Sequence, residues 1–174
     1  MTEEGAGDLA AAVADLRPRV YRFVLRQVGE PETAEDLTQE ALAEAFRGLS
    51  RYRGSARLST WVLGIALNRI RNHHNRDARR HQDTDGGEIL DSVPDTDPSV
   101  DTARSVESRR LVAAVDRAMQ DLAPELREAI VLVVLEGLPY DQAAGVAGIP
   151  TNTMKNRVLR ARRALRRAVA PDGA

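Results

Sequence analysis

The chain has 174 residues, 43% of them hydrophobic, which is enough for one domain or two small ones with hydrophobic cores. It contains no cysteine, which excludes a disulfide framework, a thiolate nucleophile and a zinc ion held by cysteine. Aromatic residues are only 3% and no stretch alternates with a period of two, so an all-α fold is predicted, while the net charge of −1 hides opposite charges in separate segments.

The N-terminus begins with an acidic segment, MTEEGAGDLAAAV, where a signal peptide would be basic, and its apolar run is too short to span a bilayer. These features predict a cytoplasmic protein without membrane insertion. A first helix is expected over residues 8–27, ended by Gly29 and Pro31. A second helix is expected over residues 33–49, where TAED resembles a capping box with Thr33 as the N-cap.

The expected second helix has two different faces. Its apolar side chains recur at helical spacing from Leu37 to Leu49, and the opposite face carries polar ones: Asp36, Gln39, Glu40 and Glu44. Polar groups opposite a buried stripe are free to contact a partner. From the residues alone, the simplest interpretation is an ordinary solvated helix face.

The next segment is strongly basic, because residues 51–82 carry eight arginines and one acidic residue. Such a block attracts a polyanion. The segment comprises a basic loop over residues 50–59 and a helix over residues 60–80, capped by Ser59 or Thr60, which is apolar in its first half and basic in its second.

No residue pattern in the chain indicates catalysis, a cofactor or a metal. Trp61, at the start of an apolar helix, is expected to be a core residue. His73 and His74 are adjacent, so they point about 100° apart on a helix and are not expected to share a metal ion. No glycine-rich phosphate loop is present either, so an enzyme is the weakest of the functional hypotheses.

An acidic linker is predicted in the middle of the chain, since residues 83–103 carry seven acidic residues and no basic one. The sequence therefore predicts a helical module over residues 1–82, a linker over residues 83–104 and a second helical module over residues 105–174. In the second module, a helix is expected over residues 105–120. Another should start at Pro124 and be buried on most sides, because its sequence is almost continuously apolar.

The stretch from Leu138 to Leu165 has the pattern of a DNA-binding helix-turn-helix. Ala144 supplies the small residue where two helices touch, and Gly148 supplies the residue where the backbone reverses. Thr151 is a candidate N-cap for the last helix, whose buried stripe is Met154, Val158, Ala161 and Leu165. The remaining faces are basic, with no acidic residue from Thr151 to Ala170. A solvated basic helix that closes a bundle explains the charges but not the alanine, glycine and cap that precede them.

Two segments of the chain together resemble the extracytoplasmic-function sigma factors of bacterial RNA polymerase. Region 2 of that family is similar to residues 21–72, which include DLTQEA. Region 4 is similar to residues 122–165, which include the helix-turn-helix. The resemblance implies that the first region binds the clamp of the polymerase β′ subunit and opens the minus-10 promoter element. It implies that the second binds the β flap and the minus-35 element. An anti-sigma protein is a further partner that it implies.

The resemblance also implies roles for individual residues. Contacts with the β′ coiled coil fall on Asp36, Gln39 and Glu40. The position that holds a flipped minus-10 base falls on Tyr52, Arg53, Arg57, Leu58, Asn68 and Arg71, which offer an amide, a stacking surface and arginines for phosphate.

For the minus-35 element, the base-reading positions fall on Lys155, Asn156, Leu159 and Arg160. Phosphate contacts are expected from Asn152, Thr153, Arg157 and Arg162. Asn156 departs from the serine common in the family.

The alternative to a sigma factor is a free-standing regulator that binds a two-fold operator as a dimer through the helix-turn-helix alone. The basic segment before the linker argues against that alternative.

Overall fold

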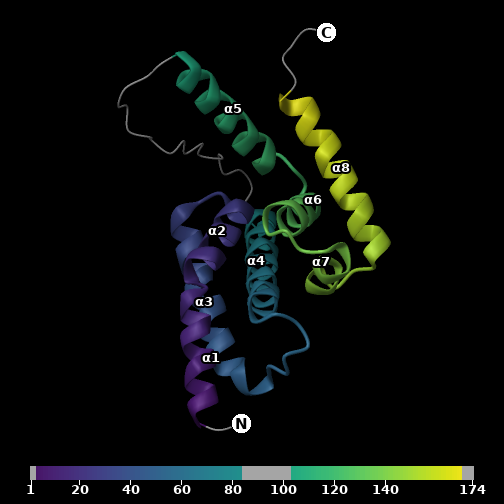
Figure 1. The fold of residues 1–174 in the computed structure, drawn as a ribbon. Helices are drawn as coiled ribbons and strands as arrows, with labels where there is room; N and C mark the ends of the chain where they lie inside the picture. The colour runs from purple at the N-terminus through teal and green to yellow at the C-terminus, as the bar shows by residue number, and fades with distance from the viewer. Residues whose placement is uncertain (1–2, 84–102, 170–174) are drawn as a thin grey trace.

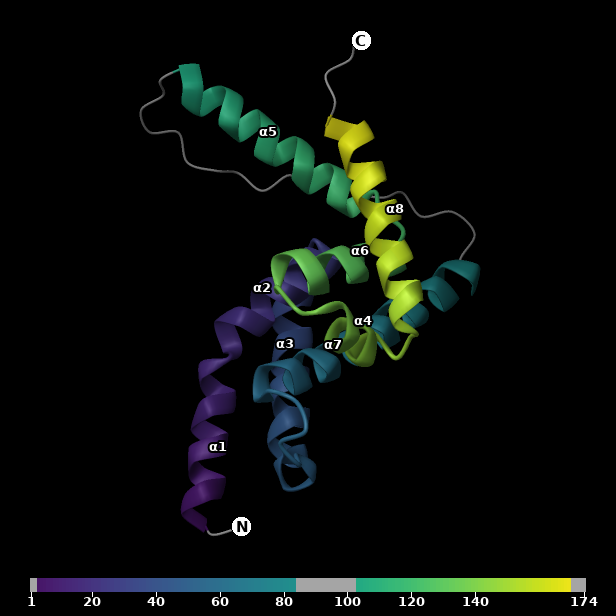
Figure 2. The ribbon, with the colours of Figure 1, turned by 45° about the vertical axis from the view of Figure 1, so that its right-hand side comes forward.

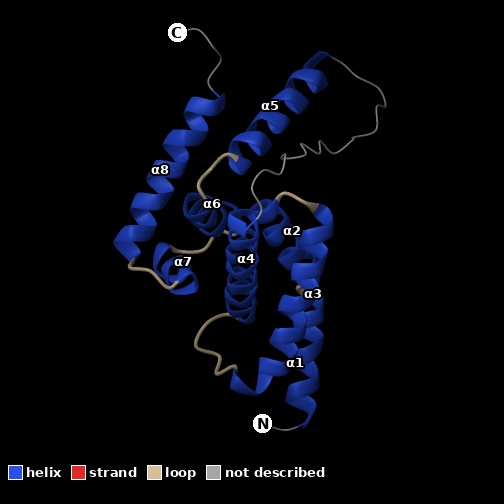
Figure 3. Cartoon of the chain, turned by 180° about the vertical axis from the view of Figure 1, so that it is seen from behind, coloured by secondary structure: helices blue, strands red, loops and turns tan. Residues whose placement is uncertain are grey.

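The computed structural model describes the backbone of residues 3–83 and 103–169, so the predicted linker lies almost entirely outside the described residues. Within those two ranges the protein is helical and contains no strand, which confirms the predicted all-α fold (Figure 3). The elements of the first range are α1 Glu3–Asp15, α2 Arg17–Val28, α3 Pro31–Gly48, the 3-10 turn η1 Leu49–Arg51 and α4 Leu58–Asp83. Those of the second are α5 Ala103–Gln120, α6 Pro124–Ile130, the π-helical turn η2 Val131–Leu135, α7 Tyr140–Ala147 and α8 Thr151–Val169.

The single first helix predicted from the sequence is wrong, because the chain breaks into α1 and α2 at Leu16. Pro18 lies in the first turn of α2. Proline has no N–H to donate and its ring clashes with the carbonyl four residues earlier, so it is tolerated at a helix start and not inside a helix. The helical spacing of the apolar side chains continues across the break, which is why periodicity alone did not reveal it.

The turn between α2 and α3 confirms one predicted signal and corrects another. Gly29 ends α2 in the left-handed conformation, with φ of 80°. The predicted capping box is wrong, because α3 begins at Pro31 with Glu30 as its N-cap. The Thr33 hydroxyl instead donates a hydrogen bond to the Glu30 carboxylate.

The long helix α4 lies between the helices α2 and α3 on one side and α7 on the other (Figure 1). It begins at Leu58, so neither Ser59 nor Thr60 is its cap as predicted. Thr60 is buried in the first turn, and its hydroxyl has no hydrogen-bond partner among the described residues. The apolar first half of α4 is buried along a stripe that comprises Val62, Leu63, Ala66, Leu67 and Ile70.

The C-terminal helices form the expected helix-turn-helix. Helix α6 starts at Pro124 as predicted and continues into η2. Burial on most sides is confirmed from Leu126 to Leu132, but Val134 and Leu135 are 44% and 45% exposed. In α8 the predicted stripe is confirmed, with Met154, Val158 and Ala161 buried and Leu165 partly buried. Helix α5 extends away from the body of the protein, and its C-terminal end approaches α8 (Figure 2).

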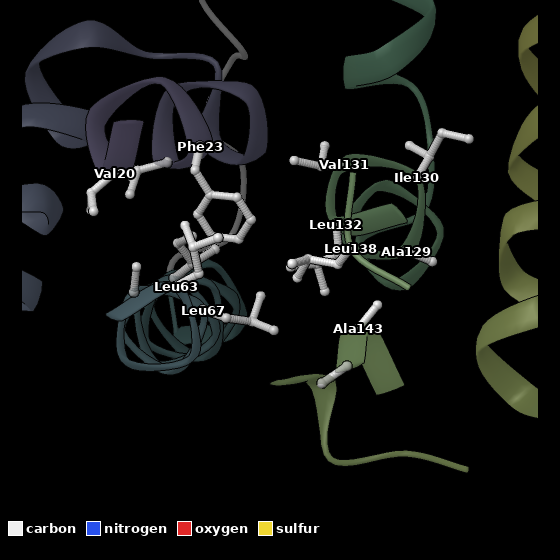
Figure 4. Packing of buried hydrophobic residues seen from close by; sticks show 14 of the residues in the cluster. Val20, Phe23, Leu63, Leu67, Ala129, Ile130, Val131, Leu132, Leu138 and Ala143 are labelled. Carbon is white, nitrogen blue, oxygen red and sulfur yellow. The ribbon is translucent and has the colours of Figure 1, made fainter. Parts of the chain in front are cut away.

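The buried side chains of the two halves form one continuous hydrophobic cluster. Figure 4 shows Phe23 of α2 and Leu67 of α4 pointing toward Leu132 and Leu138 of the C-terminal half. Each such side chain contributes about 1.5–3 kcal/mol when removed from water. The helix-turn-helix is therefore packed against the N-terminal helices.

The turn of the helix-turn-helix depends on the left-handed backbone of Gly148, which has φ of 65°. A Cβ at this position would meet no atom within 4 Å, so an alanine there is strained only by its backbone conformation. We expect Gly148→Ala to lower the free energy of unfolding by about 1–2 kcal/mol, measured by urea denaturation. The matched control is Gly145→Ala in α7, which also meets no atom within 4 Å and should stabilise the protein by about 0.5–1 kcal/mol. Equal effects of the two substitutions would contradict this account.

Candidate functional site

The outer face of α8 carries the residues predicted to contact the minus-35 element. The exposed members of this set are Asn152, Lys155, Asn156, Leu159, Arg160 and Arg162, whereas Thr153 and Arg157 are half-buried. Leu159 is an apolar side chain that is 46% exposed among basic neighbours. Apolar side chains in such a setting can pack against a thymine methyl group, while arginine and lysine donate to guanine.

The N-terminus of α8 is suited to phosphate. Its first backbone N–H groups have no partners within the helix, and the positive end of the helix dipole lies there. Asn152 and Thr153 lie in this first turn. A helix end of this kind is a general anion-binding feature of proteins.

The predicted minus-10 residues divide between the loop before α4, which holds Tyr52, Arg53 and Arg57, and α4 itself, which holds Leu58, Asn68 and Arg71. Arg53, Arg57 and Asn68 are exposed. The Tyr52 hydroxyl donates a 2.6 Å hydrogen bond to the Ala56 carbonyl, and the Tyr52 ring lies 5.3 Å from that of Trp61. Trp61 is partly buried and packs against the core cluster, which confirms its prediction as a core residue.

Two members of the predicted minus-10 set are not free in this conformation. Leu58 is partly buried against the core at the start of α4. Arg71 donates two hydrogen bonds to the Glu128 carboxylate, at 2.9 and 2.7 Å, and a third to the Ala147 carbonyl at 3.1 Å. The pKa of Arg71 is raised, chiefly by the hydrogen bonds to Glu128. Its guanidinium therefore faces the C-terminal helices.

The predicted polymerase-binding residues lie together on the exposed side of α3. Asp36, Gln39 and Glu40 are all exposed. Gln39 donates to Glu35 at 3.0 Å, and this hydrogen bond is the largest of the effects that lower the pKa of Glu35, ahead of those of Arg17. Glu40 lies 3.7 Å from Arg69 of α4. These contacts orient a polar surface and leave it accessible to a partner.

Buried charges at the junction between the two halves were missed by the sequence prediction. Arg127 is buried and donates hydrogen bonds to the carbonyls of Met119, Gln120 and Leu122, at the end of α5, and of Gln27, near the end of α2. The Arg127 guanidinium thus supplies hydrogen-bond donors to carbonyl groups at two helix C-termini, where a positive charge is also favoured by the helix dipole. Arg127 and Glu128 interrupt the apolar sequence of α6, and that interruption was the available signal.

His74 lies near the same junction, and its pKa is lowered mainly by burial, with smaller contributions from His73 and Arg127. Asp77 and Glu128 oppose this shift. The folded state therefore favours the neutral imidazole, whereas the unfolded chain takes up a proton near pH 6.5. We expect the free energy of unfolding to fall as the pH drops below about 6.5, and to fall less in His74→Gln, measured by urea denaturation at pH 7.5 and 5.5. Parallel profiles for the two proteins would contradict the prediction.

The exposed basic face of α8, presented by a helix-turn-helix, defines a helical DNA-binding protein. Two family models match the chain: Sigma-70 region 2 over residues 12–80 and Sigma-70, region 4 over residues 113–165. The chain belongs to the extracytoplasmic-function sigma factors of bacterial RNA polymerase. Members of this family direct core polymerase to specific promoters, and they are regulatory proteins.

The chain is similar to known sigma factors over most of its length. The sequence is 32% identical to the ECF RNA polymerase sigma factor EcfG of Rhodopseudomonas palustris, over 100% of this chain and 90% of that protein. It is 31% identical to the RNA polymerase sigma-H factor of Pseudomonas aeruginosa, over 88% of this chain and 81% of that protein. Among solved structures, the sigma factor RpoE in complex with the anti-sigma factor NepR from Bartonella quintana has a TM-score of 0.79 and 25% identity, covering 95% of this chain and 99% of that one.

No helix in the described part of the chain combines the length and the apolar character that crossing a membrane requires. The match of region 2 to residues 12–80 disfavours the alternative of a free-standing helix-turn-helix regulator, because that alternative gives the N-terminal half no role in reading a promoter.

Proposed function

We propose that the protein acts through two modules, an N-terminal module of residues 1–82 and a C-terminal module of residues 105–174, tethered by residues 83–104. The N-terminal module would bind core polymerase and the minus-10 element, and the C-terminal module the minus-35 element. The observation that carries this proposal is the exposed basic face of α8 in a chain that also has a region 2. The protein catalyses no reaction itself and works in the cytoplasm with the polymerase.

In the minus-10 element, Asn68 reads a base that has left the stack, with the arginines of the loop on the phosphates. Tyr52 and Leu58, both of which are partly exposed, provide the apolar surface beside that base. The exposure of Arg53, Arg57 and Asn68 supports this assignment. Stacking on an aromatic side chain contributes about 1–3 kcal/mol per base.

Two surfaces face the polymerase. The polar side of α3, with Asp36, Gln39 and Glu40, binds the β′ clamp, and its exposure supports this role. The C-terminal module binds the β flap, which is supported by exposed apolar side chains on α5: Leu111, Val112 and Val115. Apolar groups on a surface are a mark of protein contacts. An anti-sigma protein is a further partner, as in the similar complex of RpoE with NepR.

The test is a reconstitution with sigma-free bacterial core polymerase. The mixture should initiate transcription at specific promoters, whereas the protein alone should bind duplex DNA weakly. Tight, dimeric, sequence-specific binding without core would instead support the free-standing regulator. Turnover of a nucleotide or an ester by the isolated protein would overturn its assignment as a protein without catalysis.

Two arginines on the exposed side of α8 should behave differently in promoter binding. Arg160→Ala should change the preference for minus-35 bases, at a cost of about 1–3 kcal/mol on the preferred sequence. Arg162→Ala should weaken binding about equally on all sequences and lower the salt slope of log K by about 1. Binding of the polymerase complex to a promoter library at several salt concentrations measures both effects. Identical profiles for the two variants would refute the division into base and phosphate contacts.

A further inference from the structure

The loop between η1 and α4, residues 52–57, is not held in place by buried side chains. Five of its six residues, from Arg53 to Arg57, are exposed, and Tyr52 is half-buried. The tip is Gly54, which adopts the left-handed backbone with φ of 70°, and a Cβ there would meet no atom within 4 Å. Fixing the backbone of a residue carries an entropy cost, so a loop without packing needs other contacts to keep one shape.

Tyr52 supplies such contacts at the beginning and near the end of the loop. Its backbone N–H donates to the Leu49 carbonyl of η1 at 3.1 Å, and its hydroxyl donates to the Ala56 carbonyl at 2.6 Å. The neighbouring Arg57 carbonyl accepts a hydrogen bond from the Trp61 N–H of α4 at 3.0 Å. Both ends of the loop are thus attached to helical segments, and the Tyr52 hydroxyl bridges the residues between them.

The Tyr52 ring lies against a side chain that the core holds. It is 5.3 Å from the Trp61 ring, at an interplanar angle of 43°, which is the geometry of an attractive aromatic pair. Trp61 is partly buried and packs against the hydrophobic cluster. Gly48, at the end of α3, leaves room for the indole, because a Cβ at that position would lie 3.3 Å from Trp61 Cζ2. The core therefore orients, through Trp61, the ring whose hydroxyl reaches Ala56.

The loop carries two of the residues assigned to the minus-10 element. Arg53 and Arg57 are exposed, and their guanidinium groups have no partner among the described residues. The direction in which they extend is thus set by the backbone of the loop. A loop that already has its bound shape loses less conformational freedom on binding, and this raises affinity without any new contact.

We propose that Tyr52 is a positioning residue, whose hydroxyl, oriented by Trp61, keeps residues 52–57 in the shape that receives a base of the minus-10 element. This inference rests on the proposed function, because it needs the loop to bind that base. The hydroxyl acts on the loop, whereas the ring offers a surface to the DNA. Since phenylalanine keeps the ring and lacks only the hydroxyl, Tyr52→Phe separates the two roles.

The first test measures the mobility of the loop in the free full-length protein. The chain has no native cysteine, so a spin label at Ser55→Cys, an exposed position of the loop, reports on this segment alone. Tyr52→Phe should make the label more mobile in the electron paramagnetic resonance spectrum, because the loop loses the hydrogen bond that bridges it.

The matched control for this measurement is Tyr21→Phe in α2. Tyr21 packs against the core, and its hydroxyl has no hydrogen-bond partner among the described residues. Its loss should leave the label as immobile as in the wild type, and circular dichroism checks that each variant is folded. A label that is equally mobile in the wild type and in Tyr52→Phe would overturn the proposal.

The second test measures promoter opening by the protein assembled with sigma-free core polymerase. Permanganate reactivity of unpaired minus-10 thymines should appear about three- to tenfold more slowly with Tyr52→Phe, which is the range for one lost hydrogen bond. Core binding, followed by fluorescence anisotropy, should be unchanged, because the exposed side of α3 is intact. Tyr21→Phe should open the promoter at the wild-type rate. An equal rate for Tyr52→Phe would overturn the positioning role.

The difference in rate should depend on the base that the loop receives. An abasic site at that position, located by scanning the non-template strand of the minus-10 element, should make the wild type and Tyr52→Phe open the promoter equally slowly. A difference that persists on the abasic promoter would show that Tyr52 acts elsewhere. Failure of the wild type to initiate with core would refute the proposed function, whereas normal opening by Tyr52→Phe would refute the positioning role alone.

Discussion

Replacing Asp36, Gln39 and Glu40 together by alanine is expected to raise the dissociation constant for core polymerase at least about a hundredfold. Central residues of an interface cost about 2 kcal/mol or more each when truncated, and 1.4 kcal/mol corresponds to a factor of ten. Promoter-specific transcripts should fall accordingly in the reconstituted reaction. The binding of labelled protein to sigma-free core, followed by fluorescence anisotropy, measures the constant.

The fold should tolerate this triple variant, because all three side chains are exposed and their ion pairs and hydrogen bonds lie at the surface. The control is Asp8→Ala with Asp15→Ala, which removes two exposed carboxylates from α1 and should leave core binding within about twofold. Unchanged core binding in the triple variant would show that the polymerase uses another surface.

Replacing Arg127 by methionine is expected to lower the free energy of unfolding by about 2–4 kcal/mol. The substitution keeps an apolar stem but leaves carbonyls at the ends of α2 and α5 without their donor, and each unsatisfied buried group costs about 1–3 kcal/mol. Burial lowers the pKa of Arg127, yet the side chain stays charged at neutral pH. Urea denaturation at pH 7.5 measures the change.

Arg117→Met is the matched control for this prediction. Arg117 is an exposed residue of α5 that, among the described residues, donates only to the Ala113 carbonyl of its own helix, at 3.3 Å. Its loss should change the free energy of unfolding by no more than about 0.5 kcal/mol. A similar small effect of Arg127→Met would mean that water replaces the guanidinium at both helix ends.

The helices were largely predictable because their signals are local. The stripe of Met154, Val158 and Ala161 recurs with the helical period, and the stop at Gly148 needs only the left-handed backbone that glycine adopts freely. Helix starts were predicted less well. Pro18 and Pro31 each lie in the first turn of a helix, although the sequence pattern predicts the first inside a helix and the second at a helix end.

Of the candidate site, the exposed face of α8 could be located in advance, since it is what remains of the helix after its buried stripe is assigned. The engagement of Arg71 could not. Its partner Glu128 lies 57 positions further along the chain, and Ala147 lies 76 positions further. No periodicity or local motif relates residues at such separations, because their contact depends on how complete helices pack.

The sequence by itself determined the all-helical composition, the helix-turn-helix with its basic outer face, and the family, because each depends on spacing within one segment. The tertiary structure alone decided that the two halves share one hydrophobic cluster and that Arg127, Glu128 and the side chain of Glu136 are buried at their junction. Burial of a charge depends on what the rest of the chain packs around it. That packing turns arginines that would otherwise be free for DNA into partners of the protein's own carboxylates.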